Sequence, residues 1–198
     1  MAFNGDYGVS LIGGDALLNG VRITGQDDKG TGVYATGMGE VMMKEVKISE
    51  VQTGVWVKNG NLMMHKGSVA FNGGHGIYLT RGNALLKGVR ITGQGHSAEV
   101  AVKALTGTVV IKGVDISKVT TGVEVGSGAN ATLIGGEIGF MGDYGVYLNQ
   151  GGAALKNVRM TYTGNNKTAE FIKVKGGIVI AEGVNIISTT DNGQGISV

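Results

Sequence analysis

The chain has 198 residues, of which 38 are glycine, none is proline and none is cysteine. Because hydrophobic residues still make up 42%, this glycine content indicates neither collagen nor a flexible linker, but a folded chain with many tight turns. The absence of cysteine excludes a disulfide scaffold and a thiolate metal site, and a formal net charge of +2 gives no indication of a nucleic-acid partner.

The first ten residues, MAFNGDYGVS, lack the charged start and the apolar run of a signal peptide. No stretch reaches the roughly 20 apolar residues of a membrane helix. We therefore expect a chain that does not itself span a membrane, and an export signal that was either removed or never present.

A short motif of the type Gly-Val-x-Val recurs along the whole chain at intervals of 22 to 25 residues. Its copies begin at Gly8, Gly32, Gly54, Gly76, Glu99, Gly122, Gly145, Glu170 and Gly195, which gives eight full repeats and the start of a ninth. A longer unit of three repeats begins at Phe3, Phe71 and Phe140. A fixed period of this length is typical of solenoid proteins.

Each repeat contains three short apolar runs, exemplified by residues 54–57, 61–64 and 88–91. In segments such as residues 88–93, apolar residues alternate with period two. No run keeps a helical period. Three strands in each turn of 22 to 25 residues predict an all-β fold, a right-handed parallel β-helix of about eight coils, as one domain over residues 1–198.

The first strand of each coil points Val33, Val55 and Ile77 inward and a second set of residues outward. That outward set reads Ser10, Tyr34, Trp56, Tyr78, Ala101, Glu124 and Tyr147. Tyr34, Trp56 and Tyr78 follow one another and predict an exposed aromatic stripe, a candidate binding site. In coil eight, direct alignment would bury Lys173, so we expect a one-residue shift or a bulge that buries Ile172 and Val174 instead.

The second strand is apolar on both faces, and its outward positions hold Leu17, Met42, Met63, Leu85 and Val110. The next outward position is mostly basic: Asn19, Lys44, His65, Lys87, Lys112 and Lys156. Apolar surface beside a basic row is typical of a contact surface, so Met42, Met63, Leu85, Lys44, His65, Lys87 and Lys112 are candidate binding residues. The alternative is that these rows only stabilise the sheet or pack on another part of a parent protein.

The third strand presents a column of charged residues, which reads Arg22, Lys47, Ser68, Arg90, Asp115, Glu137 and Arg159. Asp115 and Glu137 lie in adjacent coils, so a spacing of about 4.8 Å would bring them close to the separation found in retaining glycosidases. A column in which arginines flank both acids is explained more simply as a surface charge network.

His75 stands in a Gly-His-Gly tripeptide that resembles the active-site tripeptide of pectin-cleaving glycosidases. That chemistry also needs aspartates one coil away, whereas Asp27 and Asp28 lie two coils back in a turn. We therefore interpret His75 as a corner residue and predict no catalytic residue. The motifs of metal, phosphate and nucleotide sites are missing, so we predict no metal and no cofactor.

The repeats VKISEVQTGVWVKNGNL, KGVDISKVTTGVEV and LKNVRMTYTG, together with the lack of cysteine, resemble the β-helical, pertactin-like passengers of type V autotransporters, in particular those of Bartonella. The resemblance implies a virulence factor that is secreted or held on the bacterial surface after outer-membrane export and binds host cells as an adhesin or receptor ligand. For an angiogenic passenger of this group, the implied partner is the endothelial vascular endothelial growth factor receptor. Because both ends fall within a coil, we expect residues 1–198 to be a fragment of a longer passenger.

Three functions are compatible with these patterns. The favoured one is an interaction protein, a rigid rod that presents its side-chain columns to a host cell-surface protein receptor or an acidic glycan. The alternatives are a polysaccharide-active enzyme that uses Asp115 and Glu137, and a purely structural stalk.

Overall fold

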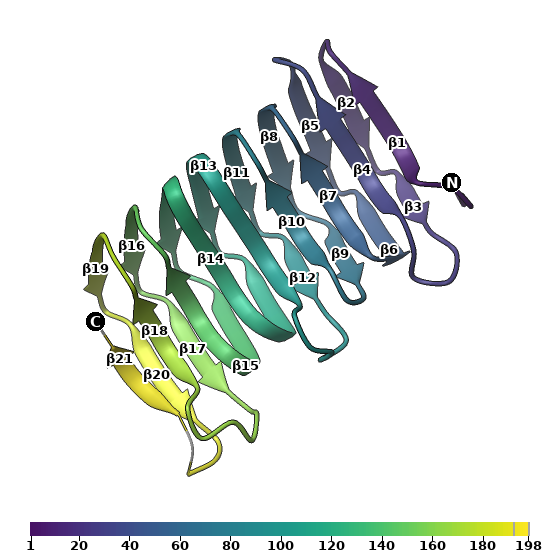
Figure 1. Cartoon of the computed structure of the whole chain (residues 1–198). Coiled ribbons are helices and arrows are strands. Elements are labelled where there is room, and N and C mark those ends of the chain that lie inside the picture. Colours follow the sequence, from purple (N-terminus) through teal and green to yellow (C-terminus); the bar gives the residue numbers. More distant parts are fainter. Residues whose placement is uncertain (192, 198) are drawn as a thin grey trace.

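The computed structural model describes residues 1–191 and 193–197, and these residues form a parallel β-helix (Figure 1). They contain strands and turns but no helix. The chain completes eight coils of three strand segments and begins a ninth, and all pairings between coils are parallel. The predicted fold class is therefore confirmed.

Each coil contributes one segment to each of three faces. The first-strand face contains β1 (Tyr7–Ile12), β4 (Thr31–Thr36), β7 (Thr53–Val57), β10 (His75–Leu79), β18 (Glu170–Val174) and β21 (Gln194–Ser197). The second-strand face contains β2 (Ala16–Asn19), β5 (Glu40–Lys44), β8 (Gly60–His65), β11 (Gly82–Lys87), β16 (Gly152–Lys156) and β19 (Ile178–Glu182). The third-strand face contains β3 (Arg22–Thr24), β6 (Lys47–Val51), β9 (Ser68–Phe71), β12 (Arg90–Thr92), β17 (Arg159–Tyr162) and β20 (Asn185–Ser188).

In the middle of the molecule, three long strands pass around the corners and join these faces: β13 (Val100–Lys112), β14 (Asp115–Ile134) and β15 (Glu137–Leu148). The loops that follow β3, β12 and β17 all project from the same edge of the solenoid (Figure 1). They recur every third coil, which is the longer period seen in the sequence.

The core is a set of vertical columns inside the coils. Val33 pairs with Val55, and Val55 pairs with Ile77, so like residues stack from coil to coil as predicted. Coil three alone buries six apolar side chains, each no more than 2% exposed: Val55, Val57, Leu62, Met64, Val69 and Phe71. Since one buried side chain of this size contributes about 1.5–3 kcal/mol, the burial between stacked coils stabilises the fold.

Coil five departs from the predicted alignment. The repeat pattern predicts that Ala101 points outward, but it is fully buried, and Lys103 pairs with Tyr78 in the outward column. The physical reason lies in the preceding loop, where the buried carboxylate of Glu99 holds the chain and delays the first strand by two residues. In coil eight the predicted one-residue shift is confirmed, because Ile172 and Val174 are buried and Lys173 pairs with Tyr147.

The corner between the second and third strands is a tight turn in every coil. One residue there always has a positive φ between 54° and 64°: Gly20, Glu45, Lys66, Gly88, Gly113, Gly135, Asn157 and Gly183. Glycine adopts this left-handed conformation at little cost, which explains its frequency at the corner. We call this edge of the solenoid the second corner.

Candidate functional site

The outer side of the second-strand face carries three parallel columns, because alternate residues of each strand point outward. The polar column contains Glu40, Asn61, Asn83, Thr108 and Asn130. The apolar column contains Leu17, Met42, Met63, Leu85 and Val110, and the basic column contains Lys44, His65, Lys87 and Lys112. The pairing register thus places the predicted second-strand residues side by side.

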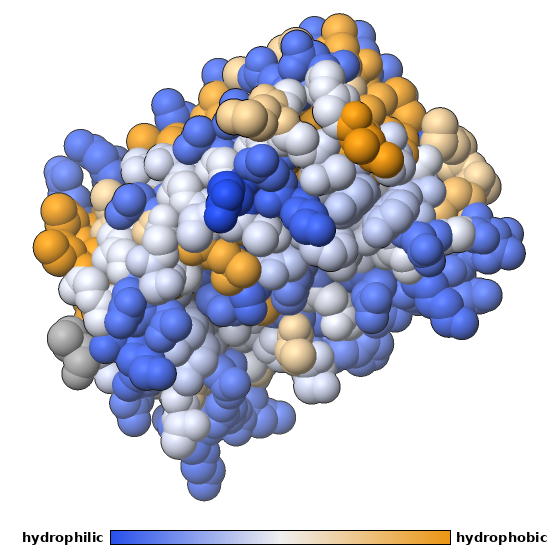
Figure 2. Space-filling model, turned by 45° about the horizontal axis from the view of Figure 1, so that its top comes forward, coloured by the Kyte–Doolittle hydropathy of each residue, from blue (hydrophilic) through white to orange (hydrophobic). Residues whose placement is uncertain are grey.

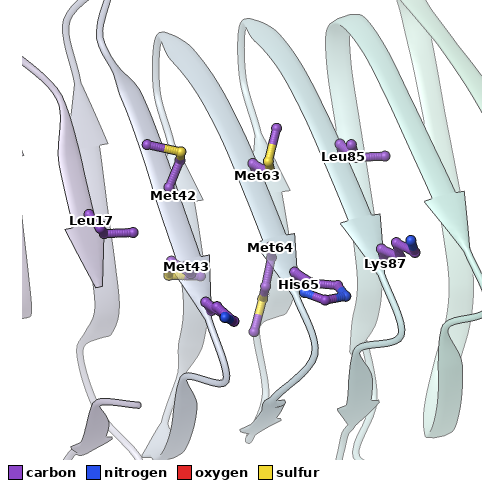
Figure 3. A pocket seen from close by; sticks show the side chains of 9 residues that line it. Leu17, Met42, Met43, Met63, Met64, His65, Leu85 and Lys87 are labelled. Atoms are coloured by element: carbon purple, nitrogen blue, oxygen red, sulfur yellow. The ribbon is translucent and has the colours of Figure 1, made fainter. Parts of the chain in front are cut away.

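The apolar column lies in a shallow groove, which we call the methionine groove. Its floor is formed by Leu17, Met42, Met63 and Leu85, and its basic rim by Lys44, His65 and Lys87 (Figure 3). The groove has a volume of about 440 Å³. Met42 and Met63 are 37% and 39% exposed, so large apolar side chains remain open to a partner.

A second hollow continues the methionine groove along the same face and shares Met63 and Leu85 with it. Its lining adds Val110, Lys112 and the polar residues Asn61 and Asn83. The Asn83 Nδ2 atom donates a hydrogen bond of 3.1 Å to Asn61 Oδ1, which ties the polar column together. The apolar strip is therefore bordered on one side by the polar column, which includes Glu40 and two amides, and on the other by basic residues.

The face of the molecule shown in Figure 2 is a mixture of hydrophobic and hydrophilic side chains. On the face shown in Figure 2, hydrophobic residues in orange lie in separate groups between hydrophilic residues in blue. The second-strand face differs from this pattern because its apolar residues form a continuous column across five coils. Contiguous apolar surface of this kind is typical of interaction sites.

The predicted aromatic stripe forms, but it is half-buried rather than fully exposed. The ring centroids of Tyr34 and Trp56 lie 5.2 Å apart, and those of Trp56 and Tyr78 lie 5.7 Å apart. Trp56 Nε1 also donates a hydrogen bond to Thr80 Oγ1 at 3.1 Å. The rings therefore contact one another, as expected of a ladder that stabilises the sheet.

Two further rings extend this ladder beyond the predicted stripe. Tyr7 stacks on Tyr34 with a centroid distance of 4.5 Å, and His75 contacts Tyr78 edge-to-face at 4.8 Å. Tyr7 and His75 each lie three positions before the outward residue of the same strand. The column of outward first-strand residues predicted from the repeat therefore does not include them. Their signal in the sequence is an aromatic or imidazole side chain just before a first-strand glycine.

His75 begins β10 at the corner position expected from the sequence. It is partly buried, and burial lowers the pKa of its imidazole below the usual value. Its ring contacts Tyr78, while the charged groups of Lys103 and Glu124 exert only smaller electrostatic effects on it. A neutral imidazole against an aromatic ring fits a packing role.

The carboxylate pair of the enzyme alternative also forms in register. Asp115 pairs with Glu137 between adjacent coils, and both side chains are exposed. Glu137 Oε1 lies 3.7 Å from Arg159 Nε and accepts a hydrogen bond of 3.3 Å from Thr161 Oγ1. Two exposed acids flanked by Arg90 and Arg159 make up a surface charge ladder.

Within residues 1–191 and 193–197, no three acidic or histidine side chains come close enough to hold a metal ion. The same part of the chain contains no helix long and apolar enough to cross a membrane. The fold defines the class of protein, a β-solenoid whose second-strand face carries an open apolar groove. No known protein family, no curated protein and no solved structure matches the chain.

Proposed function

We propose that this β-solenoid is an interaction module of the autotransporter-passenger type, secreted or displayed on a bacterial surface, which binds a protein receptor on host cells. The methionine groove is the observation that carries the proposal. It combines exposed, flexible methionine side chains with lysines at its rim. Methionine adapts its shape to different partner surfaces, and the lysines favour a partner with acidic groups next to its apolar anchor.

The resemblance of the repeats to Bartonella passengers supports the same role, and a cysteine-free chain suits export through a narrow barrel. For this reason the first receptor to test is the endothelial vascular endothelial growth factor receptor. The partner would place an apolar side chain between Met42 and Met63 and an acidic one toward Lys44 or Lys87.

The double variant Met42→Ser/Met63→Ser tests this proposal. We expect its affinity for the receptor ectodomain, and for intact endothelial cells, to fall roughly 30- to 1,000-fold, because each buried anchor at an interface is worth about 1–2 kcal/mol. Surface plasmon resonance and flow cytometry measure the two affinities. Both methionines point outward, so the fold should remain intact.

The matched control is Ile178→Ser/Ile180→Ser, which removes two apolar side chains that are 69% and 65% exposed on the same face of coil eight. We expect this control to bind like the unmodified chain. Wild-type affinity in the methionine variant, or an equal loss in both variants, would contradict the groove as the site. Asp115 and Glu137 show no feature that favours an enzyme over this binding role.

A further inference from the structure

The second corner carries at least one basic side chain in each of the first five coils. The basic column Lys44, His65, Lys87 and Lys112 forms one side of it. The beginnings of the third strands add Arg22, Lys47 and Arg90, and Lys66 lies at the corner itself. We call these eight residues the cationic corner. The acids beside them are Glu45 and Asp115.

Within the described part of the chain, none of these basic side chains forms an ion pair. The four ion pairs found there are Lys103–Glu124, Lys156–Glu182, Arg159–Glu137 and Lys173–Glu170, and none includes a residue of the cationic corner. Even Arg90, which pairs in register with Asp115, forms no salt bridge with it. The cationic corner is therefore open to an external anion.

The same corner three coils later provides an internal comparison. Lys156 and Arg159 occupy the positions of Lys87 and Arg90, 69 residues further along the chain. There Lys156 lies 3.5 Å from Glu182, and Arg159 lies 3.7 Å from Glu137. The two basic side chains at these positions thus form ion pairs in the C-terminal coils, whereas Lys87 and Arg90 form none.

Stacked like charges oppose folding, since residues directly opposite each other in neighbouring strands lie about 4.8 Å apart. Arg22 pairs with Lys47, and Lys87 pairs with Lys112. Such a stack becomes favourable when a linear anion lies along it, because each rung then meets a negative group. The five coils of the array extend over four steps of about 4.8 Å, or about 19 Å, enough for a short oligosaccharide with several acidic groups.

From these observations we infer that the cationic corner binds a sulfated, glycosaminoglycan-like polysaccharide, laid along the solenoid axis. The cationic corner lacks the aromatic rings that a site for single-stranded nucleic acid uses. Proteins that bind single strands stack bases on aromatic rings, but Tyr34, Trp56 and Tyr78 lie on the first-strand face and contact each other. Lysines, which act as separate point charges, make up most of the array.

This inference rests on the proposed function, because a sulfated polysaccharide is a partner found at host cells. The cationic corner nevertheless extends beyond the methionine groove. Arg22, Lys47, Lys66 and Arg90 do not line that groove. Glycan binding and receptor binding can therefore be separated by mutation.

The test measures the affinity of the full chain for a heparin-derived oligosaccharide by isothermal titration calorimetry. In the variants Lys87→Gln/Arg90→Gln and Lys47→Gln/Arg90→Gln we expect the affinity to fall roughly 5- to 30-fold, as for two exposed ion pairs. The matched control Lys156→Gln/Arg159→Gln removes the same number of charges at equivalent positions, and we expect a change of less than about twofold. Raising the salt concentration should weaken binding.

Three results would overturn the inference. Equal losses in the corner variants and in the control would indicate a non-specific response to net charge. Tighter binding of a single-stranded or duplex oligonucleotide than of the heparin oligosaccharide would assign the corner to nucleic acid. If no heparin binding is measurable at physiological salt, the inference that the cationic corner binds a sulfated polysaccharide is rejected.

The methionine variant separates this inference from the proposed function. If both hold, Met42→Ser/Met63→Ser keeps its heparin affinity and loses receptor binding, whereas Lys47→Gln/Arg90→Gln loses heparin affinity and keeps receptor binding. Failure of heparin binding alone rejects the cationic corner as a glycan site and leaves the methionine groove as proposed. Failure of receptor binding alone rejects the methionine groove as the receptor site and leaves the cationic corner as a glycan site.

Discussion

Replacing Glu99 with glutamine is expected to destabilise the protein by about 3–5 kcal/mol. The carboxylate of Glu99 is completely buried and accepts hydrogen bonds of 2.7–3.1 Å from the backbone N–H groups of Gly73, Gln94, Gly95 and His96. An amide retains a single acceptor oxygen, and its NH₂ group would face backbone donors. The loop 93–99 would then lose the carboxylate that accepts hydrogen bonds from its backbone N–H groups.

Chemical denaturation followed by the fluorescence of Trp56, the only tryptophan of the chain, measures this effect. Glu170 is the matched control, because it also follows an alanine and is buried, but its carboxylate has one contact of 3.2 Å, with Lys173. We expect Glu170→Gln to cost about 1–2 kcal/mol, since the amide oxygen can still accept a hydrogen bond from Lys173. Equal costs for the two variants would contradict the role assigned to Glu99.

Replacing Phe140 with alanine is expected to cost about 3–5 kcal/mol, since it empties a large volume in the core. Phe140 is fully buried, and its ring lies 5.1 Å from Tyr162 and 5.2 Å from Phe171. These three rings fill the interior of coils six to eight. Without Phe140, the two remaining rings would border a cavity.

Phe3 is the matched control for Phe140, because it occupies the same position of the three-coil repeat but is only partly buried in the first coil. We expect Phe3→Ala to cost less than half as much when both variants are compared by denaturant unfolding and by thermal melting. A cost for Phe140→Ala below about 1 kcal/mol would show that the aromatic cluster does not carry the stability of these coils.

The amino-acid sequence is sufficient to predict the fold and most of the columns. Alternation with period two decides which residues point inward, and the constant coil length brings equivalent residues together. The repeat therefore predicts that Met42, Met63 and Leu85 lie side by side on an outer face, and their pairing register confirms it. The same logic predicts the basic column beside them.

The remaining features depend on interactions that a repeat pattern does not contain. The alignment predicted for coil five is wrong because the contacts of Glu99 with backbone N–H groups lengthen its loop, and a repeat pattern does not encode these contacts. The aromatic side chains lie on the predicted face, but their burial depends on how the rings stack. The cationic corner joins two faces, so neither the second-strand nor the third-strand pattern alone predicts it.

The stacking of equivalent residues in successive coils is the claim on which both proposed surfaces depend, and engineered cysteines test it directly. The natural chain has no cysteine, so each pair can be introduced alone. Met63 and Leu85 are register partners, about 4.8 Å apart, which suits a disulfide. Leu86 is the next residue along the chain but points into the core.

The measurement is mass spectrometry of the oxidised monomer. We predict that Met63→Cys/Leu85→Cys forms an intramolecular disulfide and keeps the native fold, whereas Met63→Cys/Leu86→Cys retains two free thiols. A disulfide in the second pair and none in the first would place these residues on different faces and contradict the stacked columns.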